Sequence, residues 1–284
     1  MRSTDVLDLN KPLVSVLICS YNAEKFVEAT VRSVSNQTYA NMEILVLDND
    51  SSDETVGVLR RVAEEDPRLK IYEAMSNLGA YGGLNYLLDR AAGRYVAIND
   101  HDDIWKNDKI RRQVEFLETN GNYVGCGTAM INHYEKYNCF VMRRLRRIGT
   151  VAWHTSLVFR NSGQRYDESI KVATDFHFMK NVLCRNHLLI YNHREPYVLR
   201  RIRADHSNLS TKWIRIRNLK EILRAKVNTV DKLALLNRVL LGQTLSDYLV
   251  LMLLMRRHIL SKTDVEEYFD LEEFPLNDRF AQSL

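Results

Sequence analysis

The chain has 284 residues, of which 45% are hydrophobic and 27% charged, and its formal net charge is +4. These fractions are those of an ordinary globular protein, and so small a charge excludes the strongly basic balance of most nucleic-acid-binding domains. The four cysteines are widely spaced and contain no C-x-x-C pair. This argues against a zinc site and a disulfide scaffold, and it favours a reducing compartment.

The N-terminal residues are too polar for a signal peptide, and no apolar run reaches the roughly 20 residues that span a bilayer. The longest run, 248–255, predicts a buried helical segment. We therefore expect a cytoplasmic protein, with peripheral attachment at the inner face of the membrane as the alternative.

Strands and helices alternate in the first hundred residues. Short apolar runs predict strands at 14–19, 43–47, 70–72 and 95–98. Apolar residues at helical spacing predict helices between them, and residues 77–83 form a glycine-rich turn into the third helix. Short connections between alternating elements predict a doubly wound, mainly parallel, Rossmann-like α/β sheet. In such a sheet the loops after the strands gather along one edge, where ligands bind.

Three carboxylates follow the strand at 95–98, namely Asp100, Asp102 and Asp103. Anions this close repel one another unless a positive charge lies among them. Carboxylate oxygens suit Mn²⁺ or Mg²⁺, hard ions that leave positions open for substrate phosphates. The alternative is a polar turn that caps the next helix, but three carboxylates after a buried strand favour the metal.

Two other loops each place a candidate ligand-binding side chain at the same edge of the sheet. Tyr21 either stacks on a flat base or packs as an ordinary aromatic residue, and Asp48 either accepts a hydrogen bond from a base imide or starts a turn. With Asp100 at a ribose and Asp102 at an ion on a diphosphate, they describe a nucleoside diphosphate site. Neither a P-loop sequence nor G-x-G-x-x-G is present, so a P-loop NTPase and a dinucleotide site are poorly supported.

The second half predicts a helix between Asn107 and Gly121, followed by a return to the sheet at 123–130. Residues 133–149 are expected to be irregular, and they contain a basic cluster at 143–147. The cluster is either a solvated loop or a contact for an anionic acceptor such as a lipid diphosphate. His154 either lines the pocket or is a structural histidine.

Five segments resemble the family 2 inverting glycosyltransferases, which have the GT-A fold. They are 14–22, 44–55, 77–79 with Asn85, 98–105 followed by Lys109, and 166–168 with 174–175. The resemblance runs from about residue 13 to 210. It implies that Tyr21 stacks on the base of a sugar nucleotide, that Asp48 binds the imide, and that Asn77 belongs to the donor site. It also implies that Asp100 lies near the ribose, that Asp102 binds the metal, and that His206 completes the metal shell.

On the acceptor side, the resemblance implies that Asp175 is the general base that takes the acceptor proton. His154 is then an acceptor-side residue, and Asp103 either supports the site or binds the acceptor. Two departures from the family pattern stand out: Leu84 replaces a frequent basic residue, and Thr174 replaces the first acid of a Glu-Asp pair. Arg201 or Arg203 is the expected substitute for the missing cation.

Residues 212–257 have a helical pattern flanked by basic side chains. They are expected to pack on the domain or on a partner, with a position on an anionic membrane surface as the alternative. Residues 264–273 are expected to form an acidic surface tail. The predicted domains are a catalytic domain at 1–210 and a helical C-terminal extension at 211–284.

Together these features predict a metal-dependent glycosyltransferase. It would transfer a sugar from a nucleoside diphosphate donor, UDP-linked, to a glycan or lipid-linked glycan in surface polysaccharide assembly, and no nucleic acid is expected as a partner. Three alternatives stay open. The first is a sugar-phosphate nucleotidyltransferase, which would release pyrophosphate. The others are an inactive sugar-nucleotide binder and a non-catalytic module for nucleic acid or anionic surfaces, whose binding would be sensitive to salt.

Overall fold

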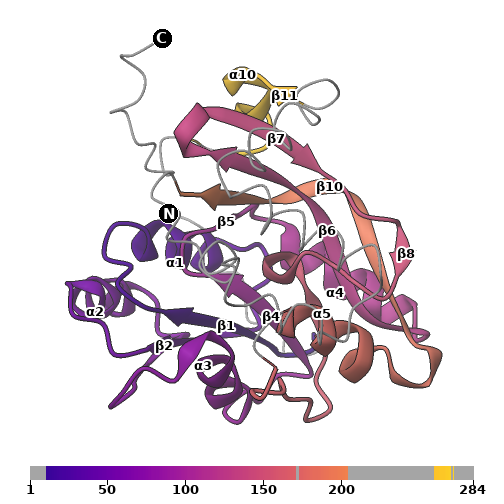
Figure 1. Ribbon diagram of the computed structural model, residues 1–284, viewed down its shortest axis with the longest axis horizontal. Coiled ribbons are helices and arrows are strands. Elements are labelled where there is room, and N and C mark those ends of the chain that lie inside the picture. The colour runs from indigo at the N-terminus through magenta and orange to yellow at the C-terminus, as the bar shows by residue number, and fades with distance from the viewer. Residues whose placement is uncertain (1–10, 171–172, 204–258, 270, 272–284) are drawn as a thin grey trace.

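A computed structural model of the chain describes residues 11–170, 173–203, 259–269 and 271. A twisted mixed sheet runs through the molecule with helices on both faces (Figure 1). Its N-terminal strands are parallel in the order β3-β2-β1-β4. This part consists of β1 (Val14–Ser20), α1 (Val27–Ser35), β2 (Met42–Asp48), α2 (Thr55–Glu65), β3 (Leu69–Glu73), α3 (Gly79–Leu88) and β4 (Tyr95–Asp100). The predicted doubly wound unit is confirmed.

Beyond β4 the sheet becomes largely antiparallel. Strand β9 (Val158–Arg160) lies between β4 and β6 (Tyr123–Tyr134), and β7 (Cys139–Arg143) and β11 (Ile259–Leu260) follow outward from β6. The long strand β10 (Leu189–Ile202) runs parallel to β6 and antiparallel to β5 (Ile104–Trp105) and β8 (Ile148–Gly149). The sheet is therefore mainly parallel only in its N-terminal half.

The helical elements of the second half are short. They are α4 (Lys109–Thr119), η1 (Glu135–Tyr137), η2 (His154–Ser156), α5 (Thr174–His177), η3 (Phe178–Leu183), η4 (Arg185–His187) and α10 (Lys262–Glu266). Helix α5 continues directly into the π-helical segment η3. Segment η3 lies on the same side of the sheet as α3, as the residues of the second core show.

Two cores sandwich the parallel strands. Because side chains alternate along a strand, Val14, Val16 and Ile18 face α1, α2 and α4, whereas Leu17 faces α3 and η3. All four of these β1 side chains are fully buried. Burial on both faces explains why the first strands are continuous apolar runs, and it holds their carboxyl ends in fixed positions.

The prediction of an irregular segment at 133–149 was wrong in part. Strand β6 continues to Tyr134, and β7 pairs with it after a turn in which Asn138 has a φ of 41°. A connection this short can only join antiparallel neighbours. Phe140 and Met142 are buried in a third core. The sequence did not indicate this strand, because its apolar part is short and a run of basic residues begins at Arg143.

The prediction of a surface tail at 264–273 was also wrong where the structure describes it. Strand β11 pairs with β7, and a capping box of Ser261 and Asp264 starts α10. Val265, Phe269 and Leu271 are buried in the third core. Val265 lies in α10, and the Phe269 N–H just beyond the helix donates to the Val265 carbonyl at 2.9 Å, while the acidic residues Asp264 and Glu266 stay exposed. The helices predicted at 212–257 and the domain boundary at 210 lie outside the described residues.

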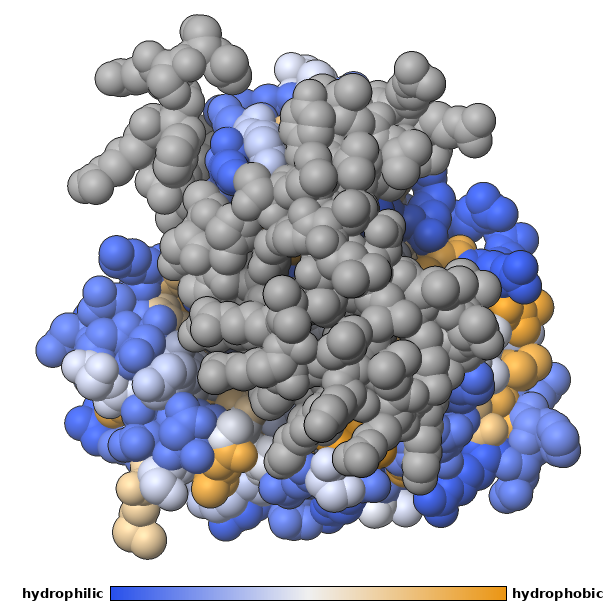
Figure 2. All heavy atoms as spheres, viewed as in Figure 1, coloured by the Kyte–Doolittle hydropathy of each residue, from blue (hydrophilic) through white to orange (hydrophobic). Residues whose placement is uncertain are grey.

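Most of the described surface that Figure 2 shows is hydrophilic. Over all described residues, the large hydrophobic side chains that are exposed are Tyr21, Met75, Leu78, Ile148, Leu189 and Ile259. Isolated residues of this kind are usual on a folded protein. No helix in the described ranges combines the length and apolar character that crossing a bilayer requires.

Candidate active site

The carboxyl ends of β1, β2 and β4 bring two of the predicted acids to one edge of the sheet. Asp48 ends β2 opposite Ser20, and Asp100 ends β4 opposite Cys19, so the two acids flank the end of β1. Burial and, after it, the charges of Asp48 and Asp100 together raise the pKa of the Cys19 thiol to about 12. Both carboxylates therefore act on the same point of the site.

The loop after β2 fixes the Asp48 carboxylate. Its Oδ2 accepts a hydrogen bond from the Ser51 N–H at 3.1 Å, while its Oδ1 is buried without a hydrogen-bond partner among the described residues. Asn22, with a φ of 46°, ties the loop after β1 to this one, because its Oδ1 accepts from the Ser52 N–H at 2.9 Å. Tyr21 directly precedes Asn22 in the loop after β1, and 44% of its surface is exposed.

The glycine-rich turn before α3 is held against the end of β2. Asn77 Oδ1 accepts hydrogen bonds from the Gly79 N–H at 2.8 Å and from Asn49 Nδ2 at 3.3 Å. Asn49 Oδ1 in turn accepts from the Leu78 N–H at 2.8 Å. Gly79 has a φ of +73°, which favours glycine. Asn49, which the sequence did not single out, thus connects Asn77 to the Asp48 loop.

The acids after β4 differ in their surroundings. Asp102 is buried, and its Oδ2 accepts from Arg203 Nε at 2.9 Å; Arg203 Nη2 also lies 2.7 Å from His101 Nε2. Asp103 is more deeply buried, and its Oδ1 accepts from the Arg201 N–H at 3.0 Å. Burial raises the pKa of Asp103 well above its usual value, and Asp102 and Asp100 add to the shift.

Asp100 is the most exposed acid of the cluster, with 40% of its side chain accessible. Partial enclosure alone would raise its pKa, but His154, Arg200 and His101 outweigh this effect and bring the pKa below its usual value. His154 Nδ1 lies 3.7 Å from Asp100 Oδ1, and its Nε2 lies 2.8 Å from the Tyr166 hydroxyl. A carboxylate, an imidazole and a phenol therefore form a continuous polar array.

Asp175 reaches the same array from a distant part of the chain. Burial lowers the pKa of His154, but Asp100 and Asp175 outweigh burial and raise it. Burial also raises the pKa of Tyr81 well above its usual value, again with contributions from Asp175 and Asp100. The rings of Tyr81 and Tyr166 are 5.2 Å apart. The structure thus brings Asp100, His154 and Asp175 together around two tyrosines.

The start of α5 sets the position of Asp175. Ala173 has a φ of 56°, and Asp175 Oδ1 accepts from the Phe176 N–H at 2.9 Å. Thr174 is buried, and its hydroxyl donates to the Ile170 carbonyl at 2.7 Å. Thr174, at the position where the family has an acid, therefore contributes a structural hydrogen bond, while the half-buried Asp175 side chain lies at the site.

The segment before α5 is anchored to α3 through Asn85. Its Nδ2 donates to the Tyr166 carbonyl at 3.0 Å and to Glu168 Oε1 at 2.8 Å, and its Oδ1 accepts from the Tyr166 N–H at 2.9 Å. This double link explains how the segment at 166–168 is positioned next to the glycine-rich turn. The sequence assigned no role to Tyr81 or Tyr166, although Tyr81 lies within the glycine-rich stretch and Tyr166 begins the segment 166–168 of the resemblance.

The two departures from the family pattern also have a structural explanation. Leu84 is buried in the core between α3 and the sheet, so this position supplies no cation. Arg201 is buried, and its Nη1 donates to Glu135 Oε1 at 2.6 Å, so its guanidinium is engaged in an ion pair with that residue. Arg203 does lie at the site, on Asp102. The predicted metal ligand His206 lies outside the described residues.

A divalent ion fits this site only together with substrate oxygens. The described part of the chain contains no group of three His, Cys, Asp or Glu side chains arranged to hold a metal. Ions at nucleotide sites commonly take one or two carboxylates and complete their shell with phosphate oxygens and water. Asp102, a buried carboxylate at the carboxyl end of a strand, has the chemistry for that arrangement.

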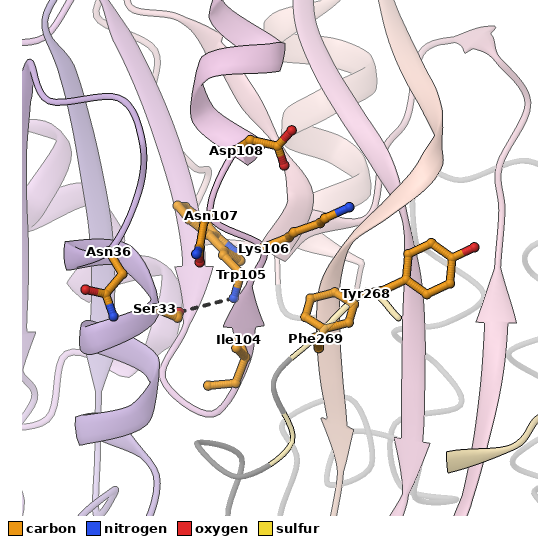
Figure 3. A pocket seen from close by; sticks show the side chains of 9 residues that line it. All are labelled: Ser33, Asn36, Ile104, Trp105, Lys106, Asn107, Asp108, Tyr268 and Phe269. Carbon is orange, nitrogen blue, oxygen red and sulfur yellow. Dashed lines mark hydrogen bonds between the residues drawn. The ribbon is translucent and has the colours of Figure 1, made fainter. Parts of the chain in front are cut away.

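A separate cavity of about 430 Å³ lies between α1, β5 and residues 268–269 (Figure 3). Trp105 and Phe269 are on its wall, and the hydrogen bond from the Trp105 N–H to Ser33 Oγ joins its two sides. None of the predicted site residues lines this cavity. It is therefore not the place where the acids of the predicted donor site meet.

A sheet of the GT-A type, with acids at the carboxyl ends of its parallel strands, is the class that this fold defines. The sequence profile described as Glycosyl transferase family 2 matches residues 15–185. The chain belongs to glycosyl transferase family 2.

Two relatives resemble part of the chain. An uncharacterized glycosyltransferase of Haemophilus influenzae is 33% identical over 66% of this chain and 58% of its own length. The Escherichia coli UDP-Glc:alpha-D-GlcNAc-diphosphoundecaprenol beta-1,3-glucosyltransferase WfgD is 41% identical over 39% of this chain and 46% of its own. The chain thus spans about half the length of these relatives.

A solved structure shares the fold. It is the mannosyltransferase PcManGT from Pyrobaculum calidifontis, in complex with GDP-Man and Mn²⁺, with a TM-score of 0.57 and 17% identity over 80% of this chain and 69% of that one. The predicted GT-A fold is thereby confirmed.

Proposed function

We propose that this protein is an inverting glycosyltransferase that moves a sugar from a UDP-linked donor to a glycan or lipid-linked glycan. The observation that carries the proposal is the meeting of Asp48, Asp100 and Asp175, from distant parts of the chain, at one edge of the sheet. The E. coli relative named above is described as using UDP-Glc and a diphosphoundecaprenol acceptor. Such an acceptor suits surface polysaccharide assembly at the inner face of the membrane.

The donor would lie across the ends of β1, β2 and β4. The exposed Tyr21 ring stacks on the base, and the free Oδ1 of Asp48 accepts the hydrogen bond of the base imide. Asp100 faces the ribose. Asn77 acts through the turn that it holds beside Asp48.

A divalent ion, Mn²⁺ or Mg²⁺, would be held by Asp102, with His206 as the second protein ligand. When bound, such an ion neutralises charge on the departing diphosphate. Asp102 must exchange its contact with Arg203 for the ion. Asp103, buried and bound to the Arg201 N–H, supports the loop that carries Asp102.

Asp175 would be the general base. An inverting transfer needs a base on the side of the sugar opposite the leaving diphosphate, and the proton of the acceptor hydroxyl moves to that base as the oxygen attacks. Asp175 lies at the start of α5, and Asp102 lies in the loop after β4, so the two functions come from separate elements. His154, held between Asp100 and Tyr166, would orient the acceptor hydroxyl.

The test is incubation of the full-length protein with Mn²⁺, a panel of sugar nucleotides and a lipid-linked or oligosaccharide acceptor. Donor-dependent release of a nucleoside diphosphate, with inversion at the anomeric carbon of the product, is expected. Release of pyrophosphate would instead identify a nucleotidyltransferase. Failure to bind any sugar nucleotide, combined with salt-sensitive binding to nucleic acid, would favour a non-catalytic module.

A further inference from the structure

The C-terminal end of β10 places three arginines at the acids after β4. Leu199 pairs with Ile104 of β5, and the Arg201 N–H donates to Asp103 Oδ1 at 3.0 Å. The strand end therefore runs directly beside the loop that contains Asp102 and Asp103.

Successive side chains of this strand point to opposite faces. The guanidinium carbons of Arg201 and Arg203 both lie 4.7 Å from the centre of the Phe26 ring, so these two side chains share one face. Arg200 must point to the other face, where His154 and Asp100 lie. Its charge indeed acts on the pKa of both of those residues.

Among the residues that the structure describes, Arg200 is the arginine of this strand end for which no side-chain partner is found. Arg201 is bound to Glu135, and Arg203 is bound to Asp102. The Arg200 guanidinium forms no hydrogen bond or ion pair with any described residue, and the side chain is partly exposed. Burial lowers the pKa of Arg200, but Asp103, Asp100 and Asp102 outweigh burial and raise it. The side chain is thus charged, near three carboxylates, and has its donors unused.

A nucleoside diphosphate at this edge would bring further negative charge to a site that already contains several carboxylates. That charge needs cations beyond one metal ion, and Leu84 shows that α3 supplies none at that position. A guanidinium presents donors in a planar fork that matches phosphate oxygens. Arg200 is the available group with that chemistry on the face of Asp100 and His154.

We propose that Arg200 binds the diphosphate of the sugar nucleotide and holds it after the sugar has left. This inference rests on the proposed function, because it assigns a residue to the donor that the function requires. It replaces the expectation that Arg201 or Arg203 supplies this contact.

The experiment compares the full-length wild-type protein with Arg200→Gln, Arg200→Lys and the matched control Arg194→Gln. Arg194 lies on the same strand with an exposed side chain. Binding of UDP and GDP is measured by calorimetry with Mn²⁺ present, and binding of uridine and guanosine is measured by ligand-observed NMR. Thermal melting verifies that each variant is folded, and Arg200→Lys serves if Arg200→Gln does not fold.

Arg200→Gln should bind the diphosphate about tenfold to a hundredfold more weakly, the loss expected when a charge-assisted hydrogen bond is removed. Binding of the nucleoside should change less than about threefold, because the nucleoside lacks phosphate. Arg200→Lys should fall between wild type and Arg200→Gln, and Arg194→Gln should match wild type.

Equal weakening of diphosphate and nucleoside would overturn the assignment, as would unchanged diphosphate affinity in a folded Arg200→Gln. Loss confined to a phosphate-bearing acceptor, with donor affinity intact, would also overturn it, since Arg200 would then serve the acceptor. If the wild type binds neither diphosphate, the proposed function fails and this inference fails with it. If the wild type binds one and the variant binds it equally well, only this inference fails.

Discussion

The buried ion pair between Arg201 and Glu135 allows a quantitative prediction about the strand that borders the site. The two side chains are 1% and 5% exposed, and Nη1 and Oε1 are 2.6 Å apart. At an effective dielectric constant of about 20, that separation corresponds to an attraction of about 6 kcal/mol, which desolvation of the two ions largely offsets. Glu135→Gln removes one charge and leaves the other buried, a change that costs about 3–5 kcal/mol.

Urea unfolding followed by circular dichroism measures this loss. The matched control is Glu73→Gln, which breaks the exposed pair of Arg60 and Glu73 and should cost less than about 1 kcal/mol. The double variant Arg201→Met with Glu135→Leu should recover much of the lost stability, because it removes both buried charges. If Glu135→Gln costs no more than Glu73→Gln, the pair is not desolvated and the reasoning is refuted.

Three further predictions concern the site and the pH dependence of stability. Asp102→Asn should abolish the Mn²⁺ dependence of nucleotide binding measured by calorimetry; unchanged dependence would remove Asp102 from the metal site. Asp175→Asn should retain donor binding and lose about 10²–10⁴-fold in transfer rate, the usual contribution of a general base; normal transfer would identify another base. Burial, reinforced by Arg201, lowers the pKa of His133 to about 4 from 6.5. Because the unfolded chain takes up the proton first, stability falls as pH drops from about 6.5 to 4, by about 3 kcal/mol. Between these pH values, the free energy of unfolding of His133→Phe, measured with urea, should fall by about 3 kcal/mol less than that of the wild type. An equal fall in both proteins would contradict the pKa assignment.

The N-terminal half of the fold was predictable from local pattern. The apolar strands at 14–19, 43–47 and 95–98 are buried on both faces, and this makes them short continuous runs with clear ends. The hairpin of β6 and β7 was not predictable in the same way. Its second strand has only three buried apolar residues between partly buried neighbours, and pairing with β6 and with the distant strand β11 decides its conformation.

The site was predictable where an acid follows a strand, because strand ends meet at one edge of the sheet. Asp48 and Asp100 are in this group, and the resemblance added Asp175. The tyrosines could not be derived in this way. Tyr166 reaches the site through the hydrogen bonds of its backbone with Asn85, and no sequence pattern encodes that contact.

Arg200 and Arg201 are neighbours at the end of β10, and their side chains point to opposite faces of the strand. We therefore expect one of them to act on stability and the other on ligand binding. Arg201 points into the buried side and pairs with Glu135, whereas Arg200 points to the face of Asp100 and His154. Glu135→Gln should therefore lower the free energy of unfolding but leave nucleotide affinity unchanged in the folded protein. Arg200→Gln should lower nucleotide affinity but leave the free energy of unfolding unchanged. If the two variants affected both quantities alike, the strand end would act as one unit, and the assignment of opposite faces to Arg200 and Arg201 would be wrong.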